Sequence, residues 1–167
     1  VTVTDATQNS AIIINDGANV TVTATTTETA TVTSSGTIDI GGANGLNTGN
    51  ATGDVVVTSN LNGADGAAAV TLTGAAINVT GGKTVNVTVN ATSAETTDDT
   101  TVSTTNQSAI NVTADNTTTS VTVKQTASVT GSDAVTAVAG VNEVSTIKFV
   151  TLANTAAVTI DGLTFTN

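Results

Sequence analysis

One sequence unit occurs three times along this chain, at residues 10–23, 75–89 and 108–124. In each copy a small residue and an alanine precede an alternating run that is centred on Ile. Turn-forming Asp, Asn or Gly residues follow, and a second run alternates Val with Thr or Asn. This two-residue period is typical of a β-strand with one buried face. The unit therefore predicts a strand, a turn and a second strand.

The third copy shows how the alternation sorts side chains between two faces of the backbone. The residues expected on the buried face are Ile110, Val112, Val121 and Val123. Those expected on the wetted face are Asn111, Thr113, Thr122 and Lys124. The core should therefore consist of small β-branched and aliphatic side chains.

The copies recur at intervals of a few tens of residues. Ile77 and Ile110 are 33 residues apart (110 − 77), and Ile12 and Ile77 are 65 apart (77 − 12), with Ile38 between them. Degenerate repeats of this length are typical of solenoids and stacked-blade proteins. The spacing therefore favours a repetitive scaffold.

The composition favours one of these architectures. The chain has no Trp, Tyr, Met, Cys or Pro and only two Phe, whereas sandwiches and propellers use bulky or aromatic core residues. Small β-branched residues fit the thin core of a parallel β-solenoid, and Gly, Asn and Asp suit its turns. We expect an all-β parallel β-solenoid built from strand-turn-strand repeats. Residues 1–167 should form one body, with a looser insert at 41–54 and a terminal layer at 144–167. The abrupt strand signal at Val1 suggests a fragment or mature piece of a longer secreted chain.

Three segments receive local predictions of their own. Residues 55–57 are all Val and predict a short buried strand, whereas residues 60–66 contain Asn, Asp and Gly and predict a turn. Residues 133–141 are the best candidate for one or two helical turns, because Val135, Val138 and Val141 have a helical spacing.

The charge balance restricts the partners. There are 13 acidic residues against three lysines, and the net charge is −10. Nucleic acids and anionic membrane surfaces require clustered cations, so neither is an expected partner. No apolar run approaches the length of a membrane span, so we expect no membrane insertion. Cations are the favoured small partners.

Enzymatic chemistry is disfavoured by missing residue types. Without His, Cys or Arg, a Ser or Thr nucleophile lacks its usual base and no phosphate clamp can form. Carboxylate pairs could hydrolyse glycosides, and the options are Asp98 with Asp99 or Asp39 with Asp54. Aromatic platforms for sugar rings are lacking, so we expect solvated acids and no enzyme.

Calcium is the favoured cation because it takes carboxylate, amide and backbone oxygens, which turns can bring together. The candidate ligands are Asp39, Asp54, Asp65, Asp98 and Asp99. Residues 41–47 begin like the glycine-aspartate nonapeptide of calcium-binding β-rolls, but Asn44 replaces the acid and no Asp follows Gly45. The alternative for each acid is ordinary turn chemistry.

Thr-x-Thr triplets raise a remote alternative, because ice-binding solenoids present such triplets on a flat face. The four triplets with Val or Leu at their centre begin at residues 2, 21, 31 and 71, with no constant interval. An ice lattice requires regular spacing, so ice binding is only a remote alternative for this sequence.

The sequence resembles the Thr-, Val-, Ala- and Asn-rich central region of bacterial surface-layer proteins of the type I-secreted, Caulobacter-like, RTX-associated kind. The segments that carry the likeness are residues 15–22, 120–127 and 158–163. The resemblance implies a β-solenoid that tiles into a calcium-stabilised lattice, secretion through a C-terminal signal and no enzymatic activity. This sequence differs from those proteins because it shows neither the calcium-binding nonapeptides nor a cell-anchoring domain. The resemblance therefore assigns no calcium ligand to a particular residue.

These observations predict a structural protein of the cell surface, outside the cell. It should self-assemble as a homo-oligomer into a surface layer, sheath or filament stabilised by calcium. Contact with cell-surface polysaccharide would run through regions not present here. The alternative is a repeat or stalk domain of a large secreted adhesin.

Overall fold

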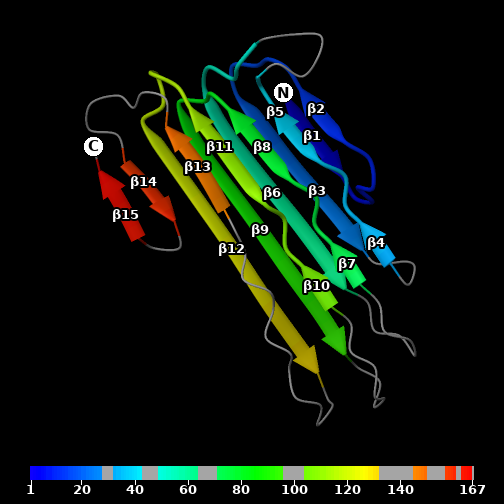
Figure 1. The fold of residues 1–167 in the computed structure, drawn as a ribbon. Helices are drawn as coiled ribbons and strands as arrows, with labels where there is room; N and C mark the ends of the chain where they lie inside the picture. The colour runs from blue at the N-terminus through cyan, green and yellow to red at the C-terminus, as the bar shows by residue number, and fades with distance from the viewer. Residues whose placement is uncertain are drawn as a thin grey trace.

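The computed structural model describes residues 1–27, 32–42, 49–63, 71–95, 104–131, 145–149, 157–160 and 163–166. All regular structure in these ranges is β-strand, and no helix occurs in them. None of the described elements is a helix long and apolar enough to cross a membrane. Figure 1 shows the strands lying side by side in layers. The expected all-β class is confirmed.

The strands form three sheets. The seven-stranded sheet contains, in spatial order, β1 (Thr2–Asp5), β3 (Val20–Thr27), β6 (Asp54–Gly63), β9 (Thr84–Glu95), β12 (Ser120–Gly131), β14 (Ala157–Ile160) and β15 (Leu163–Thr166). The five-stranded sheet contains β2 (Ile12–Ile14), β5 (Ile38–Ile40), β8 (Ile77–Thr80), β11 (Ile110–Ala114) and β13 (Ser145–Phe149). The three-stranded sheet contains β4 (Val32–Ser34), β7 (Thr71–Thr73) and β10 (Thr104–Asn106).

The chain visits the sheets in a fixed order. From β2 to β10 it passes from the five-stranded to the seven-stranded and then to the three-stranded sheet, three times over. Neighbours within a sheet are therefore not consecutive in sequence, and they pair in parallel. The exception is β15, which pairs antiparallel with β14. The two strands of each sequence unit, such as β11 and β12, belong to different sheets and do not form a hairpin.

The register confirms the repeat that the isoleucines indicated. Ile12 pairs with Ile38, Ile38 with Ile77 and Ile77 with Ile110. The sequence intervals between these residues differ, yet each step is a single neighbouring strand. The links between strands therefore absorb the irregularity of the repeat.

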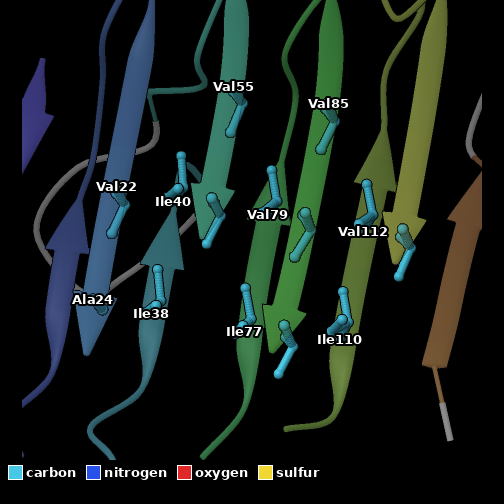
Figure 2. Close-up of a cluster of buried hydrophobic side chains, with 14 of the residues drawn as sticks. Val22, Ala24, Ile38, Ile40, Val55, Ile77, Val79, Val85, Ile110 and Val112 are labelled. Atoms are coloured by element: carbon cyan, nitrogen blue, oxygen red, sulfur yellow. The ribbon is translucent and has the colours of Figure 1, made fainter. Parts of the chain in front are cut away.

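Most of the core lies between the five-stranded and seven-stranded sheets, and Leu72 of the three-stranded sheet also belongs to it. Figure 2 shows the isoleucines and valines of β5, β8 and β11 directed toward those of β3, β6 and β9. The third copy sorts its side chains as expected, and its buried residues are Ile110, Val112, Val121 and Val123. Burial of such side chains stabilises the fold by about 1.5–3 kcal/mol for each one.

Glycine pairs form two of the corners between these sheets. Gly81 and Gly82, between β8 and β9, have φ values of 79° and 97°, a region that L side chains rarely adopt. A Cβ on Gly82 would lie 2.9 Å from Val55 Cγ2 and 3.0 Å from Val85 Cγ2. Both the backbone angle and the packing therefore require glycine at this corner.

Two local predictions were wrong. Residues 60–63 are not a turn, because they form the last part of β6, where Asn60 and Asn62 bond to side chains of β9. The run 55–57 is buried on one face only, since Val56 is 38% exposed. The helical candidate at 133–141 lies outside the described residues.

Candidate functional site

Asp39 is the first predicted calcium ligand that the structure places. It lies in the middle of β5, directed away from the core between Ile38 and Ile40. Its Oδ1 accepts a hydrogen bond of 2.6 Å from Asn78 Nδ2 on the neighbouring strand. Asp39 is thus part of a cross-strand side-chain pair.

Asp54 is the first residue of β6, at the end of the strand where the chain enters the seven-stranded sheet, and it is exposed. Its Oδ1 accepts a hydrogen bond of 2.6 Å from Thr84 Oγ1, and its N–H donates to Asn19 Oδ1 at 2.9 Å. Asp39 and Asp54 lie in different sheets, so the structure does not bring this carboxylate pair together.

The remaining predicted ligands, Asp65, Asp98 and Asp99, lie outside the described residues. Among the residues that the structure does describe, no group of three or more acidic side chains is arranged to hold a metal ion. Within this part of the chain, the two placed acids each bond to a neutral neighbour.

Asp115 shows the turn chemistry that was the alternative to metal binding. Its Oδ1 accepts hydrogen bonds from the Thr117 N–H at 2.8 Å and from Thr117 Oγ1 at 2.7 Å. Partial burial raises the pKa of Asp115, but hydrogen bonds from Thr117 and Thr118 outweigh this and hold the pKa below its usual value. Thr118 Oγ1 also donates to Gly82 O at 2.8 Å, and this bond links the Asp115 turn to the glycine corner between β8 and β9.

Outward-facing amides form a ladder on the five-stranded sheet. Asn111 Nδ2 donates to Asn78 Oδ1 at 2.8 Å, and Asn78 Nδ2 donates in turn to Asp39. The ladder therefore crosses β11, β8 and β5 at right angles to the strands. Asn78, in the middle of the ladder, uses its donor toward β5 and its acceptor toward β11.

The seven-stranded sheet carries a similar ladder. Asn90 Nδ2 donates to Asn60 Oδ1 at 3.0 Å, and Thr126 Oγ1 donates to Asn90 Oδ1 at 2.9 Å. A parallel contact joins Thr92 Oγ1 to Asn62 Oδ1 at 2.9 Å. These bonds link the side chains of β6, β9 and β12 across the outer face.

A column of threonines lies beside this ladder, and the sequence reasoning missed it. Each member pairs with the next across neighbouring strands β1, β3, β6 and β9, and the members are Thr4, Thr23, Thr58 and Thr88. A second column crosses the same strands two residues earlier and contains Thr2, Thr21, Val56 and Asn86. The test of constant intervals failed to find them, because the links differ in length while the strands stay in register. Alignment of the repeats on their Val-x-Val runs at 20–22, 55–57, 85–87 and 121–123 would have revealed them.

Comparison with known proteins gives no match: no family model, no curated protein and no solved structure is significantly similar to this chain.

Proposed function

We propose that this chain is a parallel β-solenoid that serves as a structural element of an extracellular surface layer, sheath or filament. The observation that carries the proposal is the in-register stacking of parallel strands in columns of like residues, of which Ile12, Ile38, Ile77 and Ile110 form one. Each coil would contribute one strand to each sheet. Such repeats act through their length and their surfaces, since each contacts mainly its neighbours.

The outward ladders support a mechanical role. The Asn60–Asn90–Thr126 and Asp39–Asn78–Asn111 chains of hydrogen bonds connect successive strands in addition to the backbone ladders. Satisfied side-chain networks rigidify the elements that they join. A rigid rod is the form that a layer or filament subunit requires.

Assembly would place acidic chains side by side, because every copy has a net charge of −10. We propose that calcium bridges the copies, with exposed Asp54 as a described carboxylate available at the surface. Removal of the cation should restore the repulsion between neighbours. The resemblance to calcium-dependent surface layers points the same way.

Negative-stain electron microscopy of the purified chain with calcium tests the proposal. Ordered sheets or fibres are the expected result, and they should lose order when EDTA is added. Asp54→Asn is expected to weaken calcium-dependent order, with Asp115→Asn as the control, since Asp115 already bonds within its own turn. Monodisperse rods at high concentration with calcium would contradict assembly and favour an adhesin stalk. Order that EDTA leaves unchanged would contradict calcium bridging alone.

A further inference from the structure

The outer face of the seven-stranded sheet carries a regular grid of small hydroxyl and amide side chains. Two columns have been described, and two more follow along the strands. The third contains Thr25, Asn60, Asn90 and Thr126, and the fourth contains Thr27, Asn62, Thr92 and Ser128. We call these four columns across β1, β3, β6, β9 and β12 the threonine face. Side chains on it recur about every 4.8 Å between strands and about every 7 Å along them.

The threonine face is nearly free of charge, although the whole chain has a net charge of −10. Its one described ionisable side chain is Lys124, where β12 continues the column of Thr88. Asp54 is the first residue of β6 and faces outward two residues before Val56 of the second column, so it lies at the end of the strands where the grid begins. The two described charges thus lie at the borders of the face, and its positions over β3 and β9 and from Val56 to Asn62 of β6 are neutral, which favours a neutral occupant over an ionic one.

The columns on this face differ in whether their side chains bond to one another. In the third and fourth columns Asn90 donates to Asn60, and the Thr92 and Thr126 hydroxyls donate to Asn62 and Asn90, which holds the spacing between β6, β9 and β12. None of the side-chain hydrogen bonds of the described residues involves the hydroxyls of Thr4, Thr23, Thr58 or Thr88. These hydroxyls are at least partly exposed and face outward. The face therefore combines fixed positions with hydroxyls that remain able to bond to an ordered external surface.

We infer that the threonine face binds the surface of ice. Ordered water is a neutral, repeating partner that offers both donors and acceptors to hydroxyls, and threonine methyl groups can pack between its molecules. A crystalline polysaccharide is less suited, because sugar rings stack on aromatic side chains and this chain has only two phenylalanines and no other aromatic residue. The unequal spacing of the Thr-x-Thr triplets along the sequence does not oppose ice binding, because the threonines of β1 and β3 pair directly.

Partition into a slowly growing ice finger, with protein measured in the ice and in the liquid, tests this inference. The wild-type chain should enter the ice and should shape single ice crystals. Thr58→Lys places a long charged side chain in the middle of the face and should lower retention in ice roughly tenfold, the factor that about 1.4 kcal/mol produces. Thr23→Lys should act in the same way and serves as the second variant. Circular dichroism confirms that each variant is folded.

Thr113→Lys is the matched control, because Thr113 also faces outward and is half-buried, but in β11 of the five-stranded sheet. It should keep the retention of the wild type. Exclusion of the wild-type chain from ice, or an equal loss in Thr58→Lys and Thr113→Lys, would overturn the inference. Retention of wild-type protein by crystalline cellulose but not by ice would identify a polysaccharide as the occupant instead. The inference is independent of the proposed layer, since ice retention is measured on dilute protein whether or not sheets form.

Discussion

Two columns of the seven-stranded sheet cross the same strands at adjacent residues, yet they differ in how uniform the residue type is from strand to strand. The inner column consists of Val22, Val57, Val87 and Val123. The outer column consists of their successors Thr23, Thr58, Thr88 and Lys124. All four of these inner residues are valine, whereas the outer column ends in a lysine. Packing against the five-stranded sheet dictates the inner side chains, and the outer ones are free to serve an external surface.

Adjacent substitutions give the strongest test of this difference. Val57 is fully buried, so Val57→Asp places an unpaired charge in the core and should cost more than about 4 kcal/mol, enough to prevent folding. Thr58→Asp, one residue later, should change the free energy of unfolding by less than about 1 kcal/mol. Urea unfolding followed by circular dichroism measures both. A folded Val57→Asp variant of near wild-type stability would contradict the assignment of the two faces.

A smaller effect separates two kinds of outward position. Asn90→Ala removes both hydrogen bonds that link Asn60 and Thr126 through Asn90 and should destabilise the chain by about 1–2 kcal/mol. Thr88→Ala removes a hydroxyl outside the ladder, and its cost should stay near 0.5 kcal/mol, about the range of ordinary surface substitutions. Equal losses in the two variants would show that the ladder adds nothing to the strand pairing.

The smallest expected effect concerns the Asp115 corner. Because the pKa of Asp115 is lowered in the folded chain, the unfolded chain takes up the proton at a higher pH. The contribution of Asp115 to stability is therefore complete above the ordinary value of 3.8 and is lost as the pH falls through the lowered value. Melting temperatures measured from about pH 5 down to about pH 2 should fall less steeply for Asp115→Asn than for the wild type. Parallel slopes would show that the turn does not depend on the carboxylate.

The sequence predicts the inner columns well because alternation and burial have a single physical cause. The isoleucines at 12, 38, 77 and 110 could be equated before the register was known, and their pairing is confirmed. The outer columns were not predicted, because the triplets were compared by their intervals along the chain, and these intervals vary with the lengths of the links between strands. Asn60 and Asn62 were assigned to a turn on their intrinsic preference, which the cross-strand ladder overrides. Of the predicted calcium ligands, only Asp39 and Asp54 lie in described positions, and neither position follows from residue type alone.

The links that join the seven-stranded to the three-stranded sheet have a practical consequence. They span residues 28–31, 64–70 and 96–103, and their lengths differ while the strands on both sides remain paired without a shift. The length of the chain between the strands is thus independent of their register, and adding residues between two fixed strand ends costs little free energy. A foreign peptide inserted at one of these links would be carried along one side of the stack at a spacing that the strands set. The same architecture that leaves no room for change in its core could present several unrelated sequences as an ordered row.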